Sequence, residues 1–424
     1  MTGHDHIALD EQARAILCGN DRGGYTVPTA GLYPYQWNWD SAFAAWGFAQ
    51  FDVDRAWTEI ETLFAGQWPS GMVPHILFHQ PDPGYFPGPD VWGAKRGPIP
   101  SSGITQPPVA ATFVRDIWEI DRTANAARLE PLLPKLLAWH RWFMEWRNCA
   151  FGPIFITHPW EAGRDNCPDW DTAMADIEPV GVGEYTRRDT SHVNPEMRPT
   201  KEDYDRYIWL VQRGHRLGWD DEAMAEDAPF RVGDPTMTFT LLRAHRDLLV
   251  MCEAFGHDCG ELLGWIKILE NGAEVLRNPE TGLYNGVNIT TEQHTGALSN
   301  ASFLCWYAGL DDARMADALQ QSFESCPYPV PSHAVGAADF NPKRYWRGPT
   351  WAIMNALIGR GLQDMGRDGD AKRLREATRD VIATHGFAEY FNPMTGEPAG
   401  GGTFTWTAAV WLAWASPSAG GQDG

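Results

Sequence analysis

The chain lacks the sequence features of a disulfide-stapled or membrane-spanning protein. Its 424 residues include seven cysteines, an odd number with no Cys-x-x-Cys pair, which is typical of reduced thiols in the cytoplasm. No run of about 18 apolar residues occurs, so no segment is expected to cross a bilayer. The first residues have neither the basic start nor the apolar core of a signal peptide. We therefore predict a cytoplasmic protein with no membrane partner.

Positive charge and cofactor motifs are also scarce. The 34 basic residues face 55 acidic ones, a net charge of −21, which argues against nucleic acid as a partner. The sequence contains no HExxH, calcium loop, GxGxxG, GxxxxGK[ST] or GxSxG motif. We predict no metal and no cofactor, and by elimination any chemistry rests on carboxylates.

Tryptophan, in contrast, is abundant, with 21 residues. An indole has a wide apolar face and one N–H donor, which suits stacking on a sugar ring, although large helical cores also use it. Aromatic residues alternate along the stretch YPYQWNWDSAF, at Tyr33, Tyr35, Trp37 and Trp39. The alternation predicts a half-buried strand, and Asp40 then either caps a helix from Ser41 or faces a ligand.

Helical patterns recur along the whole chain and predict an all-α fold. A ring of six helical hairpins, an α-solenoid and an irregular bundle would all give this pattern. Short β-hairpins are expected at 152–158 and 387–401. The twelve expected helices are 40–51, 54–67, 107–122, 127–147, 201–217, 236–255, 260–275, 297–309, 312–325, 349–363, 368–384 and 403–415.

No linker, charge block or low-complexity tract divides the chain. We expect a single domain over residues 1–424. Two long loops, 68–106 and 177–200, exceed the usual ~2–8 residues between bundle helices, and long ordered loops usually serve a site. We expect them to form a cap over it.

Two acidic stretches are surrounded by aromatic and turn residues. The first, HPWEAGRDNCPDWD, contains Glu161, Asp165, Asp169 and Asp171. The helix dipole explains Asp169 in the first turn of a helix starting near Pro168, whereas Asp165 precedes that helix in a Gly/Asn loop and is not easily explained as a cap.

The second acidic stretch is GFAEYFNPMTGEPAGGGTFTW, 386–406. Glu389 lies among aromatic residues, where burying a carboxylate is costly unless it is hydrogen-bonded or functional. Glu397 follows a turn and is expected to be exposed. A glycosidase needs such a pair, with one carboxyl kept protonated by an apolar setting and the other ionised.

These stretches together resemble glycoside hydrolase family 63, and more closely its bacterial branch of mannosylglycerate and glucosylglycerate hydrolases. The resemblance runs in order from about residue 30 to 410 and is carried by YPYQWNWDSAF, GQWPSGMVPHILFH, SSGITQPP, WEAGRDNCPDWD, RYWRGPTW and GFAEYFNPMTGEPAGG. It implies an (α/α)6 barrel, in agreement with the number of expected helices.

The resemblance also implies an inverting mechanism, with Asp165 as general acid and Glu389 as general base. The two carboxyls of an inverting enzyme should lie ~6.5–9.5 Å apart to admit water. The residues implied to bind the sugar are Tyr33, Trp37, Trp39 and Asp40, with Tyr345 and Trp346 in the same subsite.

The side of the leaving group is less closely defined. We assign Tyr85, Gln106 and Arg198 to it. An arginine fork suits the carboxylate of glycerate, although Arg198 could instead anchor its own loop by a salt bridge. His75 is expected in a supporting, buried and hydrogen-bonded position.

The expected function is an inverting α-glycosidase for a small, possibly anionic sugar substrate, 2-O-α-glucosylglycerate or 2-O-α-mannosylglycerate. One alternative is a glucosidase for a neutral disaccharide of the trehalose or kojibiose type. Another is a sugar 2-epimerase using His75, His192 or His333, and a third is a non-catalytic sugar-binding protein. The sequence does not separate glucose from mannose, and it leaves a homo-oligomer open.

Overall fold

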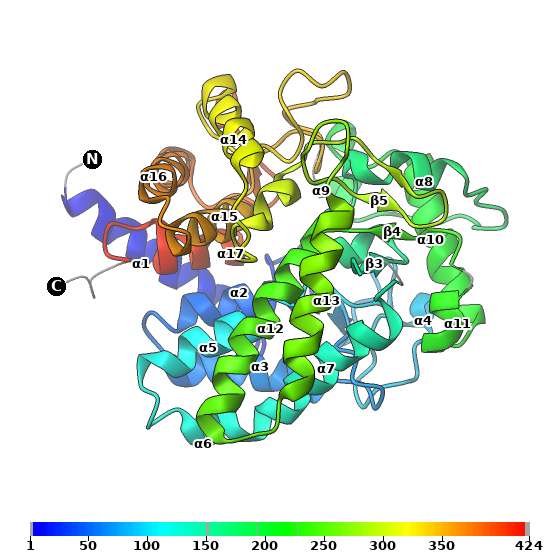
Figure 1. Ribbon diagram of the computed structural model, residues 1–424, viewed down its shortest axis with the longest axis horizontal. Helices are drawn as coiled ribbons and strands as arrows, with labels where there is room; N and C mark the ends of the chain where they lie inside the picture. The colour runs from blue at the N-terminus through cyan, green and yellow to red at the C-terminus, as the bar shows by residue number, and fades with distance from the viewer. Residues whose placement is uncertain (1–2, 150–151, 193, 227, 420–424) are drawn as a thin grey trace.

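The computed structural model describes residues 3–149, 152–192, 194–226 and 228–419. Helices make up most of this part of the chain, and its strands are two residues long (Figure 1). The predicted all-α class is therefore confirmed. None of the helices in the described ranges is long and apolar enough to span a membrane.

Six helical segments form the centre of the molecule. Each contacts the next along the chain, and the last contacts the first, so the series closes into a ring. These segments are strongly buried, and every residue of the first is buried. In chain order they are α2 (Asn38–Phe48), α5 (Ala110–Ile120), α12 (Pro235–Phe255), the 3-10 helix η5 (Asn300–Cys305), α15 (Ala352–Asp364) and α17 (Thr405–Val410).

A second set of helices packs on the outside of this ring. Each outer helix contacts at least one ring segment, and each buries only one face, as an amphipathic surface helix does. In Figure 1 the long pair α12 and α13 illustrates this arrangement in green. The outer helices are α1 (Gly3–Asn20), α3 (Val53–Ala65), α7 (Leu133–Trp146), α13 (Gly260–Leu276), α14 (Ala313–Ser325) and α16 (Asp368–His385).

One helix was not predicted from the sequence, and another packs outside the ring. No helix was predicted before residue 40, yet α1 packs against α2 and α17, so the two ends of the chain lie side by side (Figure 1). Asp10 holds it there by accepting hydrogen bonds from Trp411 Nε1 at 2.7 Å and Ser416 Oγ at 2.8 Å. The predicted helix 201–217 exists as α10 (Lys201–Arg216), but it packs on the short α4 (Pro89–Trp92) and not on the ring.

Three predicted helices are shorter or more irregular than expected. The segment 297–309 holds only the 3-10 turns of η5, which begin after the capping box of Ser299 and are followed by the left-handed Gly309. The segment 127–147 is divided by prolines into α6 (Ala126–Leu129), η1 (Glu130–Leu132) and α7. The segment 403–415 continues from α17 into a π-helical turn, η6 (Trp411–Ala415).

The strands brace the loops at one end of the ring. The predicted hairpin at 387–401 is confirmed, because β7 (Tyr390–Phe391) pairs with β8 (Pro398–Ala399). The hairpin predicted at 152–158 is wrong, because β3 (Phe155–Ile156) pairs with the distant β4 (Val232–Gly233). That sheet continues through β5 (Val287–Asn288) and β6 (Gln293–His294), while β1 (Gln36–Trp37) pairs with β2 (Ile76–Leu77).

The two long loops contain short helices and contact each other. The first loop, 68–106, contains α4, and the second, 177–200, contains α9 (Asp189–His192) and η4 (Pro195–Met197). The segment before the second loop holds η2 (Pro159–Ala162), η3 (Pro168–Trp170) and α8 (Asp171–Ala175), and α11 (Asp221–Glu226) follows α10. Arg188 of the second loop forms an ion pair with Asp82 of the first loop, with Nη1 to Oδ2 at 3.0 Å. The rings of Phe86 and Tyr185 stack with centroids 4.7 Å apart.

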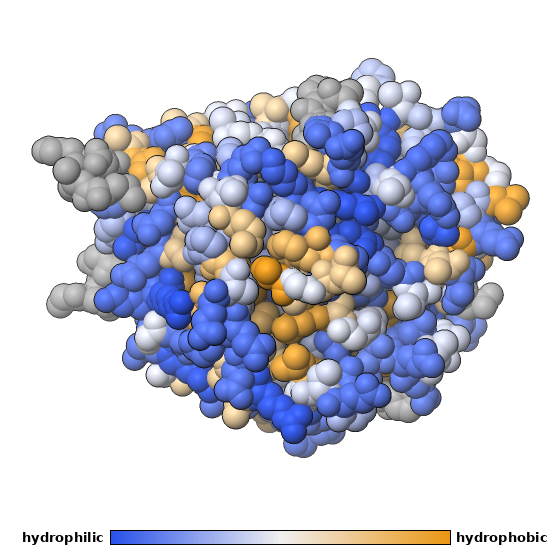
Figure 2. Space-filling view, turned by 90° about the horizontal axis from the view of Figure 1, so that it is seen from above, coloured by the Kyte–Doolittle hydropathy of each residue, from blue (hydrophilic) through white to orange (hydrophobic). Residues whose placement is uncertain are grey.

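The surface is mainly polar, as the charge composition suggests. Figure 2 shows hydrophilic side chains over most of the face seen from above, with apolar side chains gathered near its middle. Most large apolar residues of the described ranges belong to one continuous core that includes the ring. The large hydrophobic residues that are exposed are Ile7, Ile120, Val180, Leu263, Ile268 and Met394.

Candidate active site

A cavity lies where the ring helices begin. Trp39 and Asp40 stand in the first turn of α2, Gln106 precedes α5, and Phe404 and Trp406 flank the first residue of α17; all of them line the cavity. Because helix N-termini carry a partial positive charge, this end of the ring favours anionic groups. Connecting loops supply the remaining walls.

Ten of the eleven residues predicted for the site line this cavity. They are Tyr33, Trp37, Trp39, Asp40, Tyr85, Gln106, Asp165, Arg198, Tyr345 and Glu389. Trp346 is the exception, and its predicted place in the subsite is corrected. It is fully buried and stacks on Trp351 with ring centroids 3.7 Å apart, which places it behind the wall residue Trp39.

The aromatic stretch at 33–39 differs in detail from the predicted strand. Only Gln36–Trp37 has strand geometry, and Tyr35, which packs on Phe78 and Tyr85, is not among the lining residues. Helix α2 already begins at Asn38, with Trp37 as N-cap residue, so Asp40 is not its cap. Burial raises the pKa of Asp40 well above its usual range, and the nearby charge of Glu389 adds to this rise.

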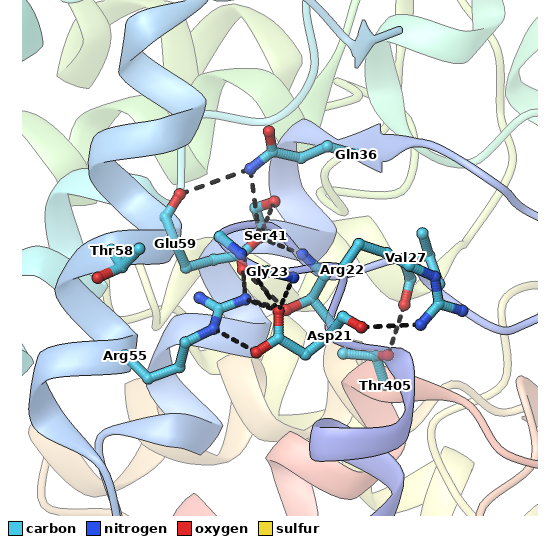
Figure 3. A network of polar contacts seen from close by, with 12 residues as sticks. Asp21, Arg22, Gly23, Val27, Gln36, Ser41, Arg55, Thr58, Glu59 and Thr405 are labelled. Carbon is cyan, nitrogen blue, oxygen red and sulfur yellow. Dashed lines mark hydrogen bonds and ion pairs between the residues drawn. The ribbon is translucent and has the colours of Figure 1, made fainter. Parts of the chain in front are cut away.

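A buried carboxylate outside the cavity holds this aromatic wall in place. Glu59 of α3 is fully buried and accepts hydrogen bonds from Gln36 Nε2 at 3.2 Å and Ser41 Oγ at 2.6 Å (Figure 3). Arg55 Nη2 donates to it at 2.7 Å, and Thr26 donates through both its N–H and its hydroxyl. The bonds to Gln36 and Ser41 fix the two ends of the segment that carries Trp37, Trp39 and Asp40.

Glu389 is held by three donors. Tyr345 and Tyr33 donate their phenol protons to Oε1 at 3.0 and 3.2 Å, and Arg198 Nη2 donates to Oε2 at 3.2 Å. Burial raises the pKa of Glu389, while the charge of Arg198 and the bonds from the two phenols oppose that rise. Donors of this kind favour the ionised form of a buried carboxylate.

Arg198 therefore lies nearer to Glu389 than the sequence indicated. It is 2% exposed and packs over the Tyr345 ring, with its guanidinium carbon 4.3 Å from the ring centroid. It joins the loop 177–200 to Glu389 and does not merely anchor its own loop. Its Nε is buried and has no hydrogen-bond partner among the described residues.

Of the four carboxylates in the stretch 158–171, only Asp165 lines the cavity. Glu161 accepts from the backbone and side chain of Thr157, Asp169 pairs with Arg164, and Asp171 pairs with Arg347. Burial raises the pKa of Asp165 to about 7, so this carboxyl holds a proton over much of the neutral range.

Glycine allows both acidic segments to approach their neighbours. Gly163 has φ +67°, and a Cβ on it would lie 2.5 Å from Trp39 Cζ2. Gly400 has φ +77°, and a Cβ there would lie 2.1 Å from Glu389 Oε2. The Gly400–Gly402 run is thus partly explained by close packing on the carboxylate, which the sequence could not separate from simple loop flexibility.

Several lining residues were not predicted from the sequence. Trp406 donates from Nε1 to the Glu389 carbonyl at 3.2 Å and meets Trp39 edge to face. The missed residues lie at helix starts or in loops, and no periodic sequence pattern marks such positions. The polar and aromatic residues missed include Trp160, Arg188, Asp189, Tyr204, Phe404 and Trp406.

Of the histidines considered for epimerase chemistry whose side chains the structure describes, His75 lines the cavity and His333 does not. His75 lines the cavity beside Trp160, and burial holds its pKa well below the usual range, so the ring is neutral. His333 bonds to Asp339 at 2.9 Å and is not among the lining residues. The side chain of His192 lies outside the described part. In the described ranges, no three His, Cys, Asp or Glu side chains are grouped as a metal site requires.

Comparison with known proteins identifies the family. Residues 33–407 match the model of the mannosylglycerate hydrolase MGH1-like glycoside hydrolase domain. The chain belongs to this family. The predicted resemblance to glycoside hydrolase family 63 is thereby confirmed, and the protein is a glycoside hydrolase.

Relatives match over nearly the whole hydrolase. A mannosylglycerate hydrolase of Thermus thermophilus is 42% identical over 95% of this chain and 99% of its own. A glucosylglycerate hydrolase of Mycolicibacterium hassiacum is 35% identical over 96% and 97%. The crystal structure of a family 63 mannosylglycerate hydrolase from Thermus thermophilus, in complex with Tris and D-glycerate, superimposes with a TM-score of 0.92 at 42% identity, covering 95% of this chain and 99% of that one.

The packing of Gly400 on Glu389 yields a prediction. Gly400→Ala should displace the carboxylate and lower kcat for glycoside hydrolysis by roughly 100-fold, since a misplacement of about 1 Å can cost that much. Gly402→Ala is the matched control, because nothing lies within 4 Å of a Cβ there. Steady-state kinetics and thermal unfolding of both variants give the comparison. If kcat of the two variants agrees within about threefold, Gly400 does not position Glu389.

Proposed function

We propose that the hydrolase cleaves a 2-O-α-hexosylglycerate with inversion, using Asp165 as general acid and Glu389 as general base. The observation that carries this proposal is the different hydrogen bonding of two buried carboxyls in one aromatic cavity. Burial raises the pKa of Asp165 to about 7, whereas Glu389 is paired with Arg198 and two phenols. Such a difference separates the acid from the base in glycosidases.

The proposed reaction follows from these two states. Asp165 gives its proton to the glycosidic oxygen as the bond from that oxygen to C1 breaks. A water on the opposite face of the sugar adds to C1 and gives a proton to Glu389. The products are a β-hexose and glycerate, and the proton on Glu389 returns through solvent to Asp165.

Glycerate suits the leaving-group side of the cavity. Arg198 brings a positive charge to the cavity wall, and Tyr85 and Gln106 line the same cavity. The solved relative from Thermus thermophilus was crystallised with D-glycerate. An anion there would also be favoured by the ring-helix N-termini.

Relatives with both sugar specificities support either hexose. Enzymes named for mannosylglycerate and for glucosylglycerate are 42% and 35% identical to this chain. We therefore propose both 2-O-α-mannosylglycerate and 2-O-α-glucosylglycerate as substrates to test. A neutral disaccharide of the trehalose or kojibiose type would present no anion to Arg188 and Arg198, the two arginines that line the cavity.

We extend the proposal to the architecture and the cellular location. The closed ring with its outer helices supports an (α/α)6 barrel as one catalytic domain, and the ion pair of Arg188 with Asp82 supports a cap formed by loops 68–106 and 177–200. None of the seven cysteines forms a disulfide in the structure, as is typical of cytoplasmic proteins.

The catalytic pair can be tested directly. Asp165→Asn and Glu389→Gln should each lower kcat on the hexosylglycerates by about 10²- to 10⁴-fold, because each removes one proton transfer. Thermal unfolding and calorimetric binding of substrate should stay close to wild type. Hydrolysis is measured in parallel with the two hexosylglycerates, trehalose and kojibiose. Near-normal kcat in either variant, or faster cleavage of a neutral disaccharide, would refute the proposal.

The pH dependence provides a separate test. Activity should fall above about pH 7 as Asp165 loses its proton, and it should fall at low pH as Glu389 gains one. Tyr345→Phe removes a bond that lowers the pKa of Glu389, so the acidic limb of kcat/KM should move to higher pH while the alkaline limb stays in place. An acidic limb that is unchanged or moves to lower pH contradicts the assignment of Glu389.

A further inference from the structure

Next to Asp165, a fully buried arginine joins three segments of the chain. Arg164 donates from Nε to Thr236 Oγ1 at 2.7 Å, from Nη2 to Asp234 Oδ1 at 2.7 Å, and from Nη1 to Asp169 Oδ2 at 2.9 Å. It also donates to Ser299 Oγ at 3.1 Å. Arg164, Asp169 and Asp234 are each 0% exposed.

The two carboxylates of this cluster are themselves fixed. Asp234 caps α12 by accepting the Met237 N–H at 3.0 Å, and Asp169 accepts the Thr295 hydroxyl at 2.9 Å. The cluster therefore fastens the loop of Asp165 to the start of α12 and to the residues before η5. These are neighbouring members of the ring.

The backbone on both sides of the Asp165 side chain is held as a result. The Arg164 carbonyl accepts from Trp170 Nε1 at 2.8 Å, and the Asp165 carbonyl accepts from the Tyr207 hydroxyl at 2.7 Å. Gly163, on the other side, lies against Trp39. The main chain of Asp165 is fixed while its carboxyl still lines the cavity.

The cluster does not touch the cavity. Arg164, Asp169 and Asp234 are not among its lining residues, so they cannot bind the sugar directly. A buried Arg–Asp cluster is also weak evidence for stability, because the cost of removing the charges from water can exceed their attraction. Its geometry does, however, fix the orientation of the loop, which proton transfer requires.

We propose that Arg164, with Asp169 and Asp234, is the positioning cluster of the general acid. It sets where the Asp165 carboxyl meets the glycosidic oxygen. This inference rests on the proposed role of Asp165. Losing the cluster should impair proton delivery to the leaving group more than attack at C1.

The test compares two leaving groups on the same sugar. Fluoride leaves with little need for protonation, whereas glycerate needs the acid, so Asp169→Asn and Arg164→Lys should lower kcat/KM for the α-hexosylglycerate by about 10²-fold or more. On the matching α-hexosyl fluoride they should stay within about fivefold of wild type. Thr236→Val removes a single bond to Arg164. It should lower the ratio of kcat/KM for the hexosylglycerate to kcat/KM for the fluoride, in the same direction as the charge variants. This variant keeps the test open if the charge variants fail to fold.

Two reference variants serve as controls for this comparison. Asp247→Asn, on the same helix α12, disturbs another buried carboxylate paired with Arg115 and Arg243; it should leave the ratio of the two rates unchanged. Asp165→Asn should show the full change in ratio, and if it does not, the acid assignment itself fails. If Asp165→Asn shows the change but the cluster variants lower both rates equally, or leave the ratio at the wild-type value, the positioning role is refuted.

Discussion

The ion pair between Arg198 and Glu389 is the interaction on which the site depends. Both side chains are almost fully buried, at 2% and 0% exposure, and a buried carboxylate without donors would take up a proton at neutral pH. Arg198 comes from the loop 177–200, Glu389 from the hairpin β7–β8, and the phenols of Tyr33 and Tyr345 from two further segments. Four distant parts of the chain must therefore fold together before the carboxylate can remain ionised.

The ring gives those segments a common frame. Its helices begin at the same end, and the residues at their starts provide both the cavity wall and the anchors behind it. Two buried ionic clusters outside the cavity then fix the segments that carry the site. Glu59 with Arg55 holds the aromatic wall, and Arg164 with Asp169 and Asp234 holds the loop of Asp165. Rigid support of this kind is what a site with narrow geometric tolerance requires.

Much of this arrangement could be predicted from the sequence, namely the parts that a local pattern or a motif indicates. Periodicity located most of the helices, and the motifs located ten of the residues that line the cavity. Periodicity could not reveal α1, whose place depends on Asp10 bonding to Trp411 and Ser416. Nor could the family resemblance show that Trp346 packs behind the wall, because a matching motif does not indicate that Trp351 covers its ring. The partners of Arg164 are 3 to 135 residues away in the sequence, so no local pattern indicated them.

The anomeric form of the first product tests the central claim most directly, since it depends on which face of the sugar the water attacks. Proton NMR of the enzyme with the α-hexosylglycerate it hydrolyses would follow the anomeric signals before mutarotation mixes them. If Asp165 acts as acid and Glu389 directs water to the opposite face, the β-hexose appears first and the α-hexose grows in later. Release of the α-hexose first would mean net retention, and would contradict this assignment of the two carboxyls.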